Sequence, residues 1–255
     1  MGKTISLVNQ KGGTGKTTST INIASILGKE GYKVLIIDLD AQGNATTCLG
    51  IDADNIRTTY DLLVDDSVKA TDVIIKKDNV DVIPTTIELA GAENTLIGVA
   101  GGEMILKEKI DPIKNDYDYI FIDCSPSLSI LTLNALACSN EVYIPIQAEF
   151  LPLKGLTQLL DTIDLVTRRV NKELQITGVI ITMYDNRKNL NKMILGKLNE
   201  YFPGKIFKTY IRNNIALAEA PGSGLSIIDY DPTSNGAVDY KNLVKEIIER
   251  NNGGK

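Results

Sequence analysis

Histidine is absent from this sequence of 255 residues, and only 5% of the residues are aromatic. Without histidine the chain cannot carry a Ser-His-Asp triad, a histidine general base or a histidine metal ligand. Any hydrolysis would have to use carboxylates, lysine, a metal ion or a positioned water molecule. The missing residue type therefore restricts the chemistry before any motif is considered.

Cysteine is scarce as well. The chain has only Cys48, Cys124 and Cys138, an odd number that includes no C-x-x-C pair. This usage predicts reduced thiols in a cytoplasmic protein. No apolar run approaches the length of a membrane span, and an apolar strand already begins at Thr4. We therefore expect neither a transmembrane segment nor a signal peptide.

Positive charge is also limited. The formal net charge is −5 and the isoelectric point is near 5.0. This balance argues against a generally basic nucleic-acid-binding protein, but it leaves room for a local basic patch.

Continuous apolar runs, each followed by a turn and a helical pattern, recur along the chain. Unbroken β-rich runs are typical of strands buried on both faces of a sheet. They lie at residues 4–8, 33–38, 80–84, 117–123, 142–146 and 177–182. Helical patterns lie at residues 18–30, 86–98, 102–115, 128–138, 155–172, 188–201 and 238–251. The alternation predicts an α/β fold with a doubly wound, mostly parallel sheet flanked by helices. No linker-like segment interrupts it, so we expect a single domain over residues 1–255, with an irregular, acidic surface region and a short helix at 51–79.

The most informative stretch, residues 8–18, follows the first of these strands and runs into a helix. It reads Val-Asn-Gln-Lys-Gly-Gly-Thr-Gly-Lys-Thr-Thr. Glycines allow several backbone N–H groups to face one anion, and the helix N-terminus adds partial positive charge. Lys16 is placed to reach the β- and γ-phosphates of a nucleotide, and the Thr17 hydroxyl to ligate Mg²⁺. A glycine-rich turn that binds nothing would require this combination to occur there by chance.

Carboxylates end two other predicted strands. Asp38 and Asp40 close the strand at 33–38, and Asp123 closes the strand at 117–123. A carboxylate at the end of an apolar strand is unfavourable unless a cation or a hydrated metal ion satisfies it. We expect Asp123 to hold a water molecule bound to Mg²⁺, and Asp38 and Asp40 to divide two roles between them. One would contact the Mg²⁺ water shell, and the other would orient a water molecule at the γ-phosphate. An acidic turn that only caps a strand is the alternative.

The octapeptide Lys11–Thr18 resembles the deviant Walker A motif of the ParA/MinD family of P-loop ATPases. Nearly the whole chain is similar to partition ATPases of the ParA/Soj type. The resemblance implies a P-loop NTPase fold, ATP or ADP with Mg²⁺ as cofactors, and catalytic roles for Lys11, Lys16 and Asp40. It implies metal-site roles for Thr17, Asp38 and Asp123. The implied nucleotide-binding residues are Lys11, Gly12, Gly13, Thr14, Gly15, Lys16, Thr17, Thr18 and Asn214.

Lys11 needs an explanation of its own. A lysine at the start of the loop points away from the phosphate of its own loop once Lys16 occupies the site. It is either a solvated surface lysine or a group that reaches a nucleotide held by another subunit. The resemblance implies a homodimer closed by ATP, in which Gly12 permits close approach and Lys11 crosses to the phosphates of the partner.

Three positions of the chain lack a proline that the family pattern usually has. Ala41, Ser125 and Arg212 stand where relatives usually have proline. The first two put the geometry of the loops after Asp40 and Asp123 in question.

Residues 165–212 form a basic region. They contain ten basic and three acidic residues, a net charge of +7 in a chain whose net charge is −5. Such a region suits contact with a phosphate backbone, although solvated lysines on helix exteriors give the same pattern. The resemblance implies binding of double-stranded DNA without sequence preference, for which the candidates are Arg187, Lys188, Lys192 and Arg212. Relatives carry further arginines where this chain has Ala216, Thr233 and Asn235.

The resemblance also implies a ParB-type centromere-binding partner that stimulates slow hydrolysis, and association with the nucleoid. Three alternatives remain: a MinD-like ATPase that cycles on membranes, an enzyme like the nitrogenase iron protein, and a nucleotide-switched protein scaffold. The last predicted helix bears on the first of these. Its apolar stripe runs from Tyr240 to Ile248, but its other face mixes lysine with glutamate. A membrane-surface helix would be mainly basic, so we expect this helix to pack on the core and expect no membrane partner.

Overall fold

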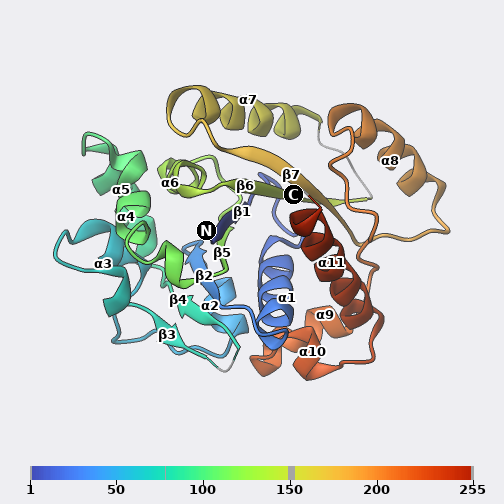
Figure 1. The fold of residues 1–255 in the computed structure, drawn as a ribbon, viewed down its shortest axis with the longest axis horizontal. Helices are drawn as coiled ribbons and strands as arrows, with labels where there is room; N and C mark the ends of the chain where they lie inside the picture. The colour runs from blue at the N-terminus through green and yellow to red at the C-terminus, as the bar shows by residue number, and fades with distance from the viewer. Residues whose placement is uncertain (1, 78, 149–152, 254–255) are drawn as a thin grey trace.

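The computed structural model describes residues 2–77, 79–148 and 153–253. Within these ranges the chain forms one seven-stranded sheet in the order β3-β4-β2-β5-β1-β6-β7 (Figure 1). All neighbouring strands pair in parallel except β3, which runs antiparallel to β4. The strands are β1 (Lys3–Leu7), β2 (Val34–Leu39), β3 (Ile75–Lys76), β4 (Asp81–Ile83), β5 (Tyr119–Cys124), β6 (Glu141–Gln147) and β7 (Gln175–Thr182). The predicted doubly wound, mostly parallel α/β sheet is thus confirmed.

Helices cover both faces of the sheet. The α-helices are α1 (Lys16–Lys29), α2 (Asn44–Cys48), α3 (Thr59–Val64), α4 (Leu89–Ile97), α5 (Ile105–Ile110), α6 (Ile130–Cys138), α7 (Leu153–Arg169), α8 (Asn189–Tyr201), α9 (Ala216–Glu219), α10 (Ile227–Tyr230) and α11 (Asn235–Asn252). Short 3-10 helices lie at Ala70–Asp72, Gly102–Met104, Lys114–Asp116 and Ala220–Ser223. None of these helices is both long enough and apolar enough to cross a bilayer, as far as the described residues show.

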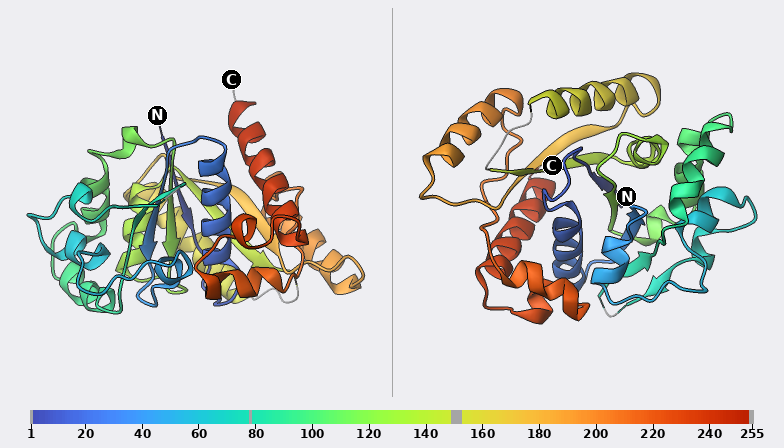
Figure 2. Two further views of the ribbon diagram at one scale, coloured as in Figure 1. Left: turned by 90° about the horizontal axis from the view of Figure 1, so that it is seen from below. Right: turned by 180° about the vertical axis from the view of Figure 1, so that it is seen from behind.

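Two apolar clusters lie on opposite sides of the sheet. One joins α1 and α11 to alternate residues of the central strands, including Ile5, Ile36 and Phe121. The other cluster packs the helices from α3 through α8 against the strand residues that face the opposite side, such as Ile37 and Ile122. All six residues of β2 and all six of β5 are buried, which is why these strands read as unbroken apolar runs. Figure 2 shows α1 and α11 side by side on one face.

Three local results refine the predicted elements. The helix predicted over 102–115 is broken, and α5 ends at Ile110 because Pro112 lacks the N–H group that a continuing helix needs. The stretch 51–79 contains its expected short helix, α3, but also supplies the edge strand β3. The stripe of the last helix, α11, packs on the core as predicted, with Tyr240 and Leu243 each at most 1% exposed.

Candidate nucleotide site and basic face

The loop between β1 and α1 is held by its own residues and by the ends of two other strands. The Asn9 amide donates to the carbonyl of Pro145 at 2.7 Å, and its Oδ1 accepts from the Lys11 N–H at 3.0 Å. The Thr182 hydroxyl at the end of β7 donates to the Thr14 carbonyl at 2.9 Å. The loop is therefore fixed against β6 and β7 before any ligand binds.

Glycine is required at Gly15, directly before α1. Its φ is +86°, and a Cβ built there would lie 3.3 Å from Cγ2 of Thr182. At Gly12 and Gly13 an added Cβ would meet no described atom within 4 Å. The middle of the loop is thus open on its outer side, whereas its junction with the helix is tightly packed.

Asp123 lies beneath the start of α1. The Thr17 hydroxyl donates to its Oδ2 at 2.6 Å, and the Thr20 hydroxyl donates to its Oδ1 at 3.3 Å. The carboxyl group is completely buried, and this burial, with the nearby Asp38, raises the pKa of Asp123 to about 7. Burial lowers the pKa of Lys16, while Asp123 opposes that change. Sequence reasoning predicted this grouping of Lys16, Thr17 and Asp123, because ligands sit at the carboxyl ends of parallel strands.

Asp38 has a different environment. Its Oδ2 accepts from the N–H and from the hydroxyl of Thr46, each at 2.8 Å, and its Oδ1 accepts from the Asp40 N–H at 3.2 Å. Burial raises the pKa of Asp38 to about 6. Because these three hydrogen bonds shape the turn after β2, Asp38 acts on the loop that carries Asp40. Its predicted contact with the Mg²⁺ water shell stays a prediction.

A cavity of about 360 Å³ opens above the loop. Gly12, Lys16, Thr17 and Asp40 line its phosphate side. The Asp40 Oδ1 accepts from the Gln42 N–H at 3.1 Å, which orients the carboxylate. The rest of the lining combines polar side chains, such as Asn22 and Asn44, with a set of apolar ones: Ile21, Pro126, Leu217, Ala220, Pro221 and Leu225.

A smaller cavity of about 170 Å³ shares Gly15, Thr18 and Leu217 with the first. Asn214 and Tyr240 also line it. The Asn214 Oδ1 is buried and accepts no hydrogen bond from any described residue. An unpaired buried acceptor is unfavourable unless a ligand donates to it, which suits the predicted contact with a base or ribose.

The described residues include no group of three or more His, Cys, Asp or Glu side chains arranged to hold a metal ion. This result fits Mg²⁺, which is usually held by one or two carboxylates, by substrate phosphates and by water. The Thr17 hydroxyl and the Asp123 carboxylate form such a minimal donor set, 2.6 Å apart.

Three of the four predicted DNA-binding cations lie together. Arg187, Lys188 and Arg212 line a cavity of about 660 Å³ between the end of β7 and the segment 210–215. Lys192 is exposed one turn along α8. Arg187 pairs with Asp185 at 2.9 Å, yet its side chain is 86% exposed. Arg212 is half-exposed and binds Asp239 at 2.7 Å. The basic face therefore exists, and within it Arg187 and Arg212 each pair with a carboxylate.

Lys11 lies at the start of the loop with its Nζ 3.0 Å from Oε1 of Gln147, at the carboxyl end of β6. Among the described residues that line the nucleotide cavity, Lys11 is not present. The prediction that Lys11 leaves its own phosphate site is consistent with this position.

Sequence reasoning missed two residues that shape the site, Thr46 and Gln147. Thr46 lies in the short helix α2 and Gln147 ends β6, and no motif around either residue indicates a role at the site. Thr182 was expected near the site because it ends a predicted strand, but its hydrogen bond to the loop was not predicted.

A parallel sheet with a glycine-rich loop, a buried lysine, and a threonine bonded to an aspartate defines a P-loop NTPase. The AAA-domain family matches residues 2–176 of this chain. The sporulation initiation inhibitor protein Soj of Bacillus subtilis is 48% identical over 253 residues, which cover 97% of this chain and 98% of that protein. The chromosome-partitioning ATPase Soj of Treponema pallidum is 44% identical and covers 98% of each chain. The chain therefore belongs to the Soj/ParA family of partition ATPases.

Solved structures with a similar fold carry nucleotide and magnesium. Cobyrinic acid a,c-diamide synthase from Mycobacterium smegmatis, with bound ADP and magnesium, has a TM-score of 0.87 at 31% identity, covering 100% of this chain and 97% of that one. The septum site-determining protein MinD of Pyrococcus horikoshii, with Mg-ADP, has a TM-score of 0.79 at 28% identity, covering 97% and 96%. The chain is an ATPase whose cofactors are ATP or ADP and Mg²⁺.

Proposed function

We propose that ATP and Mg²⁺ close two copies of this chain face to face and that the closed dimer binds double-stranded DNA without sequence preference. The position of Lys11 carries the proposal. Its Nζ contacts Gln147 at the end of β6, while Lys16 supplies the buried cation of the phosphate cavity. A second lysine in a loop that already has one is explained if it serves the phosphates of the partner.

The open glycines support the same arrangement. At Gly12 and Gly13 nothing stands within 4 Å of an added Cβ, so another backbone or a phosphate has room to approach. In this arrangement the backbone of Lys11–Thr18 surrounds the phosphates, and Lys16 neutralises their charge. Thr17 and Asp123 hold Mg²⁺ directly or through water, and Asn214 contacts the base or ribose.

Hydrolysis in this proposal depends on Asp40. Its carboxylate lines the phosphate side of the cavity and is held by the Gln42 N–H, where it can orient a water molecule at the γ-phosphate. A ParB-type centromere-binding protein would stimulate the slow reaction and release the DNA. The protein would then associate with the nucleoid only in its ATP state, because two weak basic patches act together only in the dimer.

The face that would contact DNA includes Arg187, Lys188, Lys192 and Arg212. Arg187 is the strongest candidate because its side chain is mostly exposed despite its pairing with Asp185. Exposed ion pairs are weak and are readily exchanged for a phosphate.

The MinD-like alternative receives less support. The apolar stripe of α11 is buried against α1 and the sheet, and so is unavailable to a membrane in this conformation. ATP-dependent sedimentation with anionic liposomes, without any retention of DNA, would favour that alternative.

A DNA mobility shift with ADP, ATP and a nonhydrolysable analogue, each at two salt concentrations, tests the proposal. We expect retention with ATP and with the analogue, none with ADP, and a steep loss at higher salt. Equal retention in all three nucleotide states would contradict the ATP-closed dimer.

A further inference from the structure

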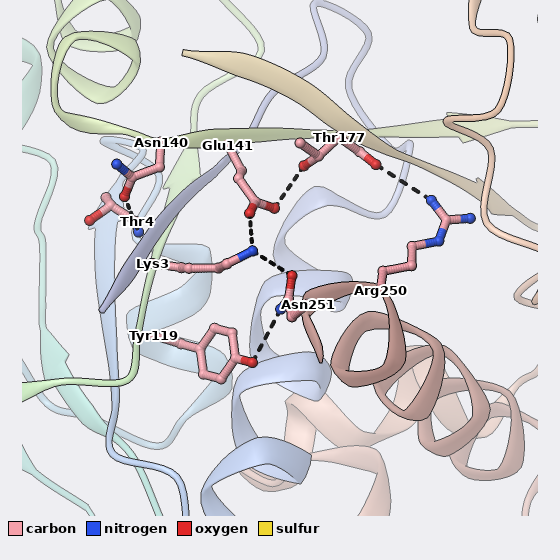
Figure 3. A network of polar contacts seen from close by, with 8 residues as sticks. All are labelled: Lys3, Thr4, Tyr119, Asn140, Glu141, Thr177, Arg250 and Asn251. Carbon is pink, nitrogen blue, oxygen red and sulfur yellow. Dashed lines mark hydrogen bonds and ion pairs between the residues drawn. The ribbon is translucent and has the colours of Figure 1, made fainter. Parts of the chain in front are cut away.

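Helix α11 is fixed at its C-terminal end by a polar network on the edge of the sheet opposite the nucleotide (Figure 3). Lys3 at the start of β1 donates to Glu141 of β6 and to Asn251 of α11. Asn251 in turn donates to the Tyr119 hydroxyl at 3.2 Å. Arg250 donates to the carbonyl of Ile206 at 2.8 Å. The helix is thus attached to β1, β5 and β6 and to the segment after α8.

The N-terminal end of the same helix lies against the base side of the nucleotide site. Tyr240 lines the smaller cavity together with Asn214, and its hydroxyl lies 3.0 Å from the Ser19 hydroxyl of α1. A Cβ built at Gly236 would lie 2.7 Å from the Cγ of Leu217, which lines both nucleotide cavities. A helix fixed at both ends provides a rigid support for this wall.

Asp239 connects that support to the segment that carries Asn214. Its carboxylate accepts hydrogen bonds from three groups of Arg212: from the backbone N–H at 2.9 Å, from Nε at 2.9 Å and from Nη2 at 2.7 Å. Asp239 is buried, at 6% exposure, whereas the Arg212 side chain is 45% exposed. The bidentate pair together with the backbone bond restrains both the position and the direction of the chain at Arg212.

The segment reaches Asn214 two residues later. On its other side it is tied to β7, because the Ile211 N–H donates to the Ile181 carbonyl at 2.8 Å. After Arg212, the unpaired Oδ1 of Asn214 is buried at the base cavity. Asp239 therefore restrains the chain two residues before Asn214, the residue proposed to contact the base.

We propose that Asp239 is a positioning residue for the nucleotide base: through Arg212 it holds Asn214 where its carboxamide oxygen accepts a hydrogen bond from the amino group of adenine. The inference rests on the proposed role of Asn214. An acceptor at this place favours adenine, which presents an N–H donor at C6, over hypoxanthine, which presents an oxygen there. A precisely held acceptor discriminates between the two bases, and a loosely held one does not.

The pair has a second consequence. While Arg212 is bound to Asp239, it is less available to DNA than the exposed Arg187. By pairing with Arg212, Asp239 thus holds one cation of the basic face beside the nucleotide site.

The test uses Asp239→Asn, which keeps the size of the side chain but removes its charge, in the full-length protein. Glu249→Gln is the matched control, because it makes the same change at an exposed position of α11. Titration calorimetry with Mg²⁺ present measures binding of ATP, of ITP and of inorganic tripolyphosphate, which has no base. Thermal unfolding of each variant shows whether the fold is retained.

We expect Asp239→Asn to weaken ATP binding roughly tenfold, to lower the ratio of ATP to ITP affinity at least threefold, and to leave tripolyphosphate binding unchanged. Glu249→Gln should match the unmodified protein in all three. An unchanged ATP to ITP ratio, or an equal loss for ATP and tripolyphosphate, would overturn the positioning role. Failure of the unmodified protein to bind ATP would instead contradict the proposed nucleotide site.

If Asp239→Asn fails to fold, Arg212→Ala keeps the proposal testable. It removes the guanidinium from the other side but leaves the backbone N–H bond to Asp239. We expect a smaller fall in the ATP to ITP ratio than for Asp239→Asn, and no change in that ratio would count against the proposal.

Discussion

The phosphate cavity and the basic face differ in how far their charged side chains are buried. Around the cavity, Lys16, Asp38 and Asp123 are all buried. Burial and the nearby Asp38 raise the pKa of Asp123, and Lys16 opposes that change. On the basic face, Arg187 is 86% exposed and pairs with the carboxylate of Asp185, two residues before it. Buried charges are sensitive to the removal of one partner, whereas exposed pairs contribute little and respond to salt. The fold therefore fixes the charges of the nucleotide site, while the proposed contact with DNA would depend on exposed, salt-sensitive groups.

Lys16→Ala should have the largest effect. It removes the only lysine that lines the cavity, as far as the described residues show, and leaves the phosphates without their buried cation. We expect ATP affinity to fall at least about 100-fold by titration calorimetry. Lys29→Ala, at the other end of α1, is the control and should bind normally. Retained affinity in Lys16→Ala would refute the assignment of the phosphate loop.

Asp40→Ala separates binding from hydrolysis. We expect ATP binding to remain and turnover to fall at least about 50-fold, because no carboxylate would orient the attacking water. The ATP-bound dimer should then accumulate, which light scattering would detect as a doubled mass. Asp40→Asn is the matched variant that keeps the hydrogen bond from Gln42. A monomer in the presence of ATP would count against the closed dimer.

The stability of the nucleotide-free protein should fall as the pH rises through 7. Because the pKa of Asp123 is raised to about 7 in the folded state, the folded protein holds a proton that the unfolded chain releases near pH 4. Raising the pH from 6 to 8 should therefore lower the free energy of unfolding, by an amount on the order of 1 kcal/mol.

Urea unfolding at the two pH values, with a chelator present, measures this change. Asp123→Asn is the control and should remove most of the pH dependence, since its amide does not titrate. An increase in stability toward pH 8 would contradict the burial of an uncompensated carboxyl pair.

The smallest effect should distinguish two arginines on the basic face. We expect Arg187→Ala to weaken DNA retention about threefold in the ATP state and Arg212→Ala to weaken it less, because Asp239 holds Arg212. Mobility shifts at low and moderate salt, with ATP affinity measured in parallel, make the comparison. A larger loss for Arg212→Ala would mean that its pairing with Asp239 opens on DNA.

The sequence predicted the sheet because its central strands, β2 and β5, are buried on both faces and so lack polar alternation. It predicted the phosphate loop because three glycines, Lys16 and Thr17 lie between a strand and a helix, where together they can bind phosphate and Mg²⁺. Asp40 and Asp123 followed, since the carboxyl ends of parallel strands meet at one edge of a sheet.

Other contacts could not be read from the chain. The bond from Thr46 to Asp38 spans 8 residues, and the bond from Thr182 to the loop spans 168. Nothing in the local pattern around either threonine predicts these side-chain contacts. The helix predicted over 102–115 is also too long, because Pro112 ends the helical hydrogen bonding and α5 stops at Ile110.

Local chemistry thus determined the class of this protein. The spacing of glycine, lysine and threonine is sufficient for a phosphate site wherever a strand meets a helix. Only the tertiary structure decided how its charges are distributed. Asp239 and Arg212 are separated by 27 residues, yet they meet because α11 packs along α1 and reaches the end of β7. Arg212, which the family resemblance predicts to bind DNA, is instead held by Asp239 beside the nucleotide site. The packing of α11 brings this buried carboxylate to it, and sequence spacing does not encode that packing.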